Sequence, residues 1–220
     1  QALVEWESLN LDDRIPIYVG ANGPKALAAT GAYGDGRISA GTEPISVMQK
    51  NMDRVQRGAE EAERALPDDF HTAVLTYSSV LRSGETLESP RVVDEVGAPV
   101  VSSLHFWYEI MLQRGNDGFI QDAVRDEWED YKCHVDAMLE ARRHQTLHEG
   151  HCAFLPEAER RFVTPAMIKA TAGLVGSPDE IREQIRSMET AGLREVLLLP
   201  PVHCARENFR EFADNVISAR

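Results

Sequence analysis

The stretch IPIYVGANGPKALAATGAYGDG, residues 15–36, joins a short apolar run to a glycine-rich loop and an alanine-rich segment that begins with a proline. The apolar run at 15–20 predicts a buried strand, and Pro24 suits the first turn of a helix over 24–33. Between them, Gly20, Asn22 and Gly23 form the connection. Two explanations are open: the tight turn of a strand–helix connection, or a backbone that must approach a ligand closely.

The same order of strand and helix recurs along the chain. Apolar runs rich in Val, Ile and Leu predict further strands at 37–41, 71–80 and 195–200. Apolar residues at spacings of three and four, with SPDE as a capping sequence before one of the segments, predict helices over 44–66, 177–191 and 205–220. Continuous apolar strands that alternate with helices are typical of an α/β fold with a parallel sheet.

The interval 84–164 interrupts this order. It contains helical patterns at 90–113 and 119–148, which predict a helical insertion before the last strand. A (β/α)8 barrel of the TIM type needs roughly 250 residues, so four strand–helix units and an insertion correspond to about half of one. The alternative is a complete small doubly wound sheet that acts on a phosphorylated metabolite.

Composition and charge exclude several classes of function. The chain has a net charge of −13, whereas a nucleic-acid or anionic-membrane surface needs clustered Lys and Arg. No apolar run approaches the roughly 20 residues that span a bilayer, and the first residues do not resemble a signal peptide. The three cysteines lack C-x-x-C spacing, which suits reduced thiols. We expect a cytoplasmic protein with a small-molecule substrate, without nucleic-acid or membrane partners.

Three segments resemble the luciferase-like monooxygenases, a bacterial family of FMN- or coenzyme F420-dependent oxidoreductases. They are YVGANGPKALAATGAYGDGRISAG at 18–41, LHEGHCAFLPEAERRFVTPAMIKATAGLVG at 147–176 and GSPDEIREQIRSMETAGLREVLLLPP at 176–201. The resemblance covers nearly all of the chain, residues 1–220, but only the C-terminal half of the family's barrel. It implies strands five to eight of a TIM-type barrel, with the N-terminal half of the barrel missing from this chain and 84–164 inserted before the last strand.

The resemblance also implies where the cofactor, FMN or F420, binds. In the family it lies across the carboxyl ends of the strands, so two loops of this chain are expected to contact it. The loop after the first strand would lie against the cofactor with its backbone, and the loop after the second would receive a phosphate. The expected cofactor-binding residues are Gly20, Ala21, Asn22, Gly23, Ser39, Ala40, Gly41 and Thr42. Glu43 is a departure, because a carboxylate in the second loop repels phosphate unless it points away.

Further polar and aromatic side chains are candidates for the substrate pocket. Tyr77 and Ser78 end the predicted strand at 71–80, where barrel enzymes keep functional groups. His203 follows the last strand, and His105 and Tyr108 lie on the helix after the third visible strand. No motif identifies a catalytic residue. In the family, the acid and base groups of several members lie in the half that is absent here.

The histidines of RRHQTLHEGHC, residues 142–152, raise the possibility of a metal site. His144 and His148 share a helix face, and His151 and Cys152 follow. The pattern lacks the glutamate of H-E-x-x-H, and no second group of ligands is evident in the sequence. We therefore expect no metal, and histidines that pack or cap a helix end.

Taken with the resemblance, these features predict a flavin- or deazaflavin-dependent oxidoreductase that transfers hydride to or from a small organic substrate, or activates dioxygen on it. The alternative is a non-catalytic flavin-binding or partner subunit derived from the same family. The helical insertion holds a large share of the aromatic residues, which are enriched at subunit interfaces, so we expect a homodimer.

Overall fold

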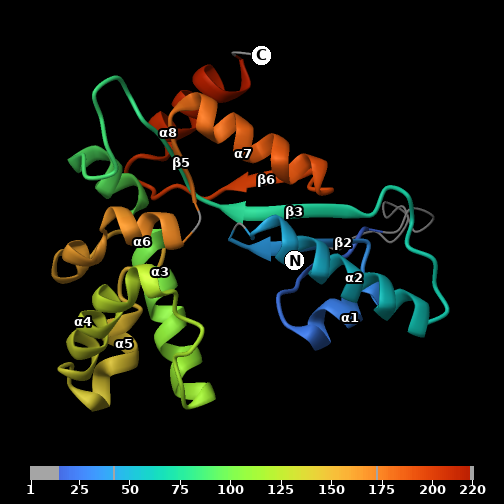
Figure 1. Cartoon of the computed structure of the whole chain (residues 1–220), viewed down its shortest axis with the longest axis horizontal. Helices are drawn as coiled ribbons and strands as arrows, with labels where there is room; N and C mark the ends of the chain where they lie inside the picture. The colour runs from blue at the N-terminus through green and yellow to red at the C-terminus, as the bar shows by residue number, and fades with distance from the viewer. Residues whose placement is uncertain (1–14, 42, 172, 219–220) are drawn as a thin grey trace, which may run out of the picture.

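The computed structural model describes residues 15–41, 43–171 and 173–218. Its main sheet has four parallel strands, β1 (Tyr18–Gly20), β2 (Gly36–Ala40), β3 (His71–Thr76) and β6 (Glu195–Leu198), in the order β1-β2-β3-β6. These strands therefore lie side by side in chain order, as successive strands of a barrel do. The parallel sheet with interleaved helices confirms the expected α/β class (Figure 1).

Helices α1 (Pro24–Tyr33) and α2 (Ile45–Glu61) follow β1 and β2 and pack against each other. Two glycines make this contact close. A Cβ on Gly31 would lie 1.9 Å from the carbonyl oxygen of Val55, and a Cβ on Gly58 would lie 2.2 Å from that of Ala28. The two backbones thus touch directly, and Leu27 and Val55 are buried beside them.

The third strand changes partners at Tyr77. We expected one strand over 71–80, but β3 ends at Thr76, and β4 (Ser78–Val80) pairs with β5 (Leu174–Gly176) in a separate two-stranded parallel sheet. The main-chain carbonyl of Thr76 still accepts a hydrogen bond from Leu199, whereas that of Tyr77 accepts one from Leu174. The three-residue strand β5 was not expected, since so short a run carries little periodicity.

Two further helices, α7 (Pro178–Thr190) and α8 (Ala205–Phe212), continue the helical layer beyond α2 along β3 and β6, and Met48 of α2 belongs to the same core as Met188 of α7. Helix α7 begins at the expected cap: Ser177 and Glu180 form a capping box, in which each side chain bonds the backbone of the other. Helix α8 continues into a π-helical turn, Ala213–Ile217. Their apolar faces enclose a core with Val74 of β3 and Leu174 of β5.

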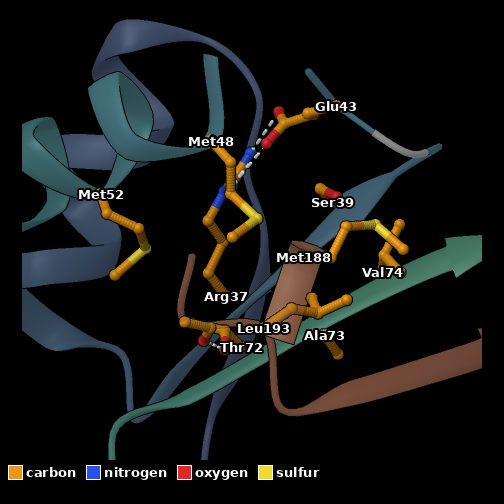
Figure 2. Close-up of a pocket in the computed structure, with 11 residues that line it drawn as sticks. Arg37, Ser39, Glu43, Met48, Met52, Thr72, Ala73, Val74, Met188 and Leu193 are labelled. Atoms are coloured by element: carbon orange, nitrogen blue, oxygen red, sulfur yellow. Dashed lines mark hydrogen bonds and ion pairs between the residues drawn. The ribbon is translucent and has the colours of Figure 1, made fainter. Parts of the chain in front are cut away.

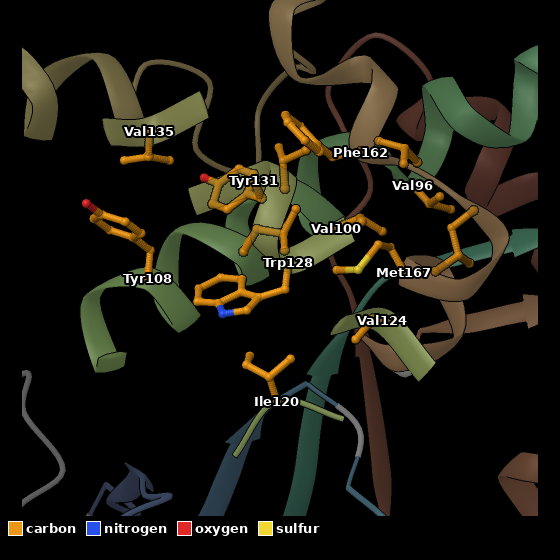
Figure 3. Packing of buried hydrophobic residues seen from close by; sticks show 14 of the residues in the cluster. Val96, Val100, Tyr108, Ile120, Val124, Trp128, Tyr131, Val135, Phe162 and Met167 are labelled. Atoms are coloured by element: carbon orange, nitrogen blue, oxygen red, sulfur yellow. The ribbon is translucent and has the colours of Figure 1, made fainter. Parts of the chain in front are cut away.

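The remaining helices form a region with its own core beyond the carboxyl end of β3 (Figure 1). Its helices are α3 (Pro90–Arg114), α4 (Arg125–Asp136), α5 (Arg143–Leu147) and α6 (Pro165–Ala170), with 3₁₀ turns at Asp122–Val124, Glu140–Arg142 and Glu157–Phe162. Figure 3 shows Trp128, Tyr131 and Phe162 converging in this core with aliphatic side chains of α3. The core extends to Tyr77 and to Ile168 of α6, so it reaches past both ends of 84–164.

Two expected helices are shorter than their sequence patterns. The helix expected over 44–66 ends at Glu61, because Glu63 adopts a left-handed conformation with φ 52° and turns the chain. Arg64 then donates hydrogen bonds to the carbonyls of Gly31 and Gly34 at 3.2 and 2.8 Å. The helix expected over 119–148 is broken into α4 and α5, and the bend lets buried side chains of both face the same core.

Both outer strands of the main sheet have one neighbour each. Within the described ranges, β1 pairs only with β2, and β6 only with β3. The expectation of a buried strand over 15–20 is wrong: β1 covers only Tyr18–Gly20, and Ile17 and Tyr18 are 52% and 45% accessible, because β1 is an edge strand of the described sheet. An open edge of this kind is a surface for further strands. No helix in the described part of the chain is long and apolar enough to cross a lipid bilayer.

The contact between α1 and α2 can be tested with one methyl group. We expect Gly58→Ala to lower the free energy of unfolding by about 1–3 kcal/mol. The added Cβ would overlap the Ala28 backbone, which cannot move away easily. This loss should appear even though alanine favours a helix by about 1 kcal/mol over glycine.

The matched control is Gly118→Ala, whose Cβ would have its nearest neighbour at 3.6 Å. Urea denaturation should give a change within about 0.5 kcal/mol for this variant. Equal stability of Gly58→Ala and wild type would contradict the close packing of the two helices.

Candidate functional site

A cleft of about 660 Å³ lies between the carboxyl ends of the main strands and the helical region. One wall comes from the strand ends and the loops that follow them, namely Asn22, Ala40, Gly41, Pro44, Leu75, Thr76, Tyr77 and Leu199. The other wall comes from the helical region, with Pro99, Ser102, Ser103, Phe106, Trp107, Gln121, Cys152, Lys169, Ala170 and Thr171. This is the end of a parallel α/β sheet at which ligands bind.

The lining combines an apolar surface with a few polar groups. The apolar lining residues include Leu75, Leu199, Pro99, Phe106 and Trp107. Hydroxyl, amide and ammonium groups are distributed around it, and Lys169 is the one charged side chain among the described lining residues. A cleft of this size and composition suits a ring system with polar substituents.

Neither backbone conformation nor packing against the described residues requires glycine at Gly20 or Gly23. Neither Gly20 nor Gly23 has a positive φ, and a Cβ on either would meet no atom within 4 Å. Ala21 between them is fully buried, and its N–H donates to the Ile38 carbonyl at 3.2 Å. The tight-turn explanation of the two glycines therefore fails, because a larger residue would neither strain the backbone nor clash here.

Arg37 ties the two loops together from the helix side of the sheet. Its Nε donates to the Ala21 carbonyl at 2.9 Å, and its two terminal nitrogens bind both carboxylate oxygens of Glu43 at 2.9 and 2.6 Å. Asn51 of α2 donates to the same carboxylate at 2.9 Å. Figure 2 shows the Arg37 side chain reaching to Glu43 past Met48.

This arrangement removes the electrostatic objection to an anion near the second loop. Arg37 is 4% exposed and Glu43 14%, so the pair is shielded from water and its charges compensate each other. Sequence reasoning missed Arg37. The available signal was an arginine inside a strand expected to be covered on both faces, which requires an acidic partner nearby.

The second loop is only partly described. Ala40 and Gly41 line the cleft, and Gly41 has φ 84°, a conformation that favours glycine. Ser39 is buried on the opposite face of the strand, where its hydroxyl donates to the Gly41 carbonyl at 3.1 Å. Thr42, an expected phosphate ligand, lies outside the described residues. Asn22 also lines the cleft, whereas Gly20, Ala21 and Gly23, which were expected to contact a cofactor, are not among its lining residues.

Tyr77 lies at the point where β3 changes partners, and it lines the cleft. Its hydroxyl is 2.6 Å from Thr171 Oγ1, which also lies 2.9 Å from the Met167 carbonyl oxygen. Either of these two hydroxyl groups can be the donor in the contact between them. Burial raises the pKa of Tyr77 to about 12, so the phenol is neutral at physiological pH.

The other four expected pocket residues do not line the cleft. Ser78 is buried, and its hydroxyl donates to Asn208 of α8 at 3.0 Å, which fixes that helix against β4. Tyr108 is buried in the helical core and donates to Asp136 at 2.6 Å. His203 is exposed in the turn before α8.

His105 is fully buried, with Nε2 3.0 Å from Glu159 Oε1. Each of the four thus faces away from the cleft because its polar group has another partner or lies in solvent.

A second, much smaller cavity of about 20 Å³ lies between the sheet and the helices α2 and α7. Met48, Met52 and Met188 surround it together with Arg37 (Figure 2). Such a volume holds about one water molecule, so it is a packing feature and not a ligand site.

The chain matches known proteins over most of its length. The family model described as luciferase-like monooxygenase matches residues 4–195. The chain belongs to the luciferase-like monooxygenase family. This confirms the family that the sequence resembled.

Several solved structures are similar to this chain. The F420-dependent tetrahydromethanopterin reductase of Methanopyrus kandleri is 19% identical with a TM-score of 0.60, and the match covers 93% of this chain and 51% of that chain. An F420-dependent secondary alcohol dehydrogenase is 19% identical, with coverages of 93% and 50% and a TM-score of 0.49.

An FMN-bound oxygenating constituent of 3,6-diketocamphane monooxygenase from Pseudomonas putida is 13% identical, with coverages of 90% and 47% and a TM-score of 0.43. This luciferase-like chain therefore spans about half the length of the solved structures it matches, 51% of the first. At such identities the likeness concerns the fold alone.

The Arg37–Glu43 pair of this luciferase-like chain gives a direct test of how the two loops are held. We expect Arg37→Met to lower the free energy of unfolding by about 3 kcal/mol, because it leaves the shielded Glu43 carboxylate without its main partner. The double variant Arg37→Met/Glu43→Gln should regain part of this loss.

Urea denaturation of the single and double variants measures the coupling between the two side chains. Additive losses in the double variant would show that the two side chains do not interact, and would contradict the bidentate pair.

Proposed function

We propose that this chain forms the cofactor-binding half of a flavin- or deazaflavin-dependent oxidoreductase, with FMN or F420 bound in the cleft of about 660 Å³ at the carboxyl ends of the strands. The observation that carries the proposal is the glycine-rich loop at the rim of this cleft. Its two glycines are required by neither backbone conformation nor packing within the described chain. A ligand that approaches the loop backbone closely accounts for both.

The residues present fit such a cofactor. The open backbone at Gly20 and at Gly23 would lie against it, and Asn22 already lines the cleft. The second loop leads through Pro44 into α2, whose positive N-terminal end favours a phosphate. Thr42, which precedes Glu43 in the sequence of the second loop, is proposed as a ligand of the same phosphate. Phe106, Trp107 and Leu199 would cover the ring system.

The cofactor carries the redox chemistry in such enzymes: it transfers hydride or, as reduced FMN, reacts with dioxygen. The residues of this chain would bind and orient the cofactor and the substrate, and would exclude water from the cleft. Tyr77 lines the cleft with its hydroxyl hydrogen-bonded to Thr171, so its ring forms a fixed part of the wall against which a substrate would lie. The substrate we propose is a small organic molecule seated between Tyr77 and the α3 wall.

The glycine loop provides the first test. In the full-length protein, Gly20→Val and Gly23→Val should weaken cofactor binding about tenfold or more while leaving thermal unfolding of the cofactor-free protein nearly unchanged. The reason is that the valine side chains would enter the space of the ligand and not that of the protein. Titrations with FMN and with F420, followed by fluorescence, measure both affinities and separate the two cofactors.

Gly118→Val is the matched control, an exposed glycine away from the cleft, and it should bind cofactor as the wild type does. If neither cofactor binds the full-length wild-type protein at tens of micromolar, the proposed function is wrong.

Cysteine footprinting provides the second test. Cys152 lines the cleft, whereas Cys133 is exposed on α4 away from it. Burial raises the pKa of Cys204 to about 11, which keeps this third thiol protonated and slow to react.

We expect saturating cofactor to protect Cys152 from iodoacetamide and to leave Cys133 labelled at its original rate, as measured by peptide mass spectrometry. Unchanged labelling of Cys152 by a protein that binds the cofactor would place the cofactor elsewhere.

A further inference from the structure

Three histidines from separate parts of the sequence meet in the helical region. His105 of α3, His148 directly after α5, and His151 each offer a ring nitrogen, and these atoms lie within 4.8 Å of one another. His105 is buried, His148 is partly buried and His151 is exposed. The group therefore runs from the core of the helical region to its surface.

His105 has a nitrogen without a protein partner. Its side chain is fully buried, and Nε2 lies 3.0 and 3.1 Å from the two oxygens of Glu159. Its Nδ1 has no hydrogen-bond partner among the described residues. Buried polar atoms are nearly always satisfied, so an orphaned imidazole nitrogen beside two further imidazoles points to a ligand between them.

We propose that His105, His148 and His151 bind a divalent transition-metal ion of the Zn²⁺ type. Neutral imidazole is a preferred ligand of Zn²⁺. A metal-binding histidine almost always donates its other ring N–H to a carboxylate, a backbone carbonyl or a water molecule, which fixes the ring. Glu159 holds His105 in this way, and Glu109 Oε1 lies 2.8 Å from Nε2 of His148.

The ring nitrogens of the three histidines must move closer together to bind one ion. Nitrogens bound tetrahedrally to Zn²⁺ at about 2.05 Å lie about 3.3 Å apart, so separations of up to 4.8 Å must shorten. The exposed His151 can move inward without disturbing the core. Its exposure also gives the ion access from solvent and leaves a fourth position for water.

The sequence alone argued against a metal, because the segment with His144, His148 and His151 lacks the glutamate of H-E-x-x-H and no second group of ligands was evident. The fold adds His105 and Glu159. It also removes Cys152, which turns to the cleft, where its N–H donates to Ser102 Oγ at 2.9 Å. A metal here would tie α3 to the segment that carries Cys152, and so hold one wall of the cleft in place.

A second group, Glu109, His144 and His148, shares His148 with the first. It differs because His144 is 81% exposed and no member of this group is buried. A surface group of this kind is common without an ion. The two groups can be told apart by removing the residue that belongs to only one of them.

The test uses ZnCl₂ and the purified protein, stripped of metal with a chelator and without FMN or F420. Equilibrium dialysis should give one Zn²⁺ per chain with a dissociation constant in the micromolar range or below. His151→Ala should weaken this binding at least about 100-fold, and Glu159→Gln about 10- to 100-fold. The control His144→Ala should stay within about threefold of the wild type.

Because His105 and Glu159 are buried, their variants can fail to fold, whereas His151→Ala and His144→Ala alter partly or fully exposed side chains and keep the comparison valid. The proposal is wrong if no saturable Zn²⁺ binding occurs, or if His144→Ala removes it and His151→Ala does not. Since no cofactor is present, either result leaves the proposed oxidoreductase function unaffected.

Discussion

The site depends on the hydrogen bonds and the ion pair that the Arg37 guanidinium makes. This guanidinium joins the Ala21 carbonyl of the first loop to the Glu43 carboxylate of the second, and Asn51 attaches the same carboxylate to α2. Arg37 thus fixes the distance between the two loops that follow β1 and β2, and it does so from the helix side of the sheet. Because arginine offers a rigid planar array of donors, this geometry depends on the residue type and not on charge alone.

The change of strand partner at Tyr77 shapes the cleft. Up to Thr76 the chain belongs to the main sheet, and from Ser78 it pairs with β5. The Tyr77 ring packs against Gly173, where a Cβ would come within 2.1 Å of it. This bend directs the chain toward α3, so the helical region comes to lie opposite the strand ends. Tyr77 both lines the cleft and belongs to the core of the helical region, so it lies where the two walls of the cleft meet.

The helical region has a polar interior as well as an apolar one. Alongside Trp128 and Tyr131, it buries His105 and Glu159, and Tyr131 directs its hydroxyl to Glu159 at 3.5 Å. Burying ionisable groups in an apolar core costs free energy unless they are paired or bind an ion. The orphaned nitrogen of His105 shows that pairing within the described chain is incomplete, which is the physical basis for placing a metal ion there.

The sequence by itself determined the local elements and the family. The order of strand, loop and helix at 15–36 and the Ser177 cap depend on neighbouring residues, so their patterns were sufficient to predict them. The burial expected for the strand was wrong, because burial depends on which elements pack against it. Tyr77 was likewise placed at a strand end by its position. Only the tertiary structure decided that Arg37 pairs with Glu43, that β3 changes partners, that His105 joins His148 and His151, and that Ser78 turns away from the cleft. Each of these depends on how side chains pack in three dimensions, and most join residues far apart in the chain, which local periodicity does not encode.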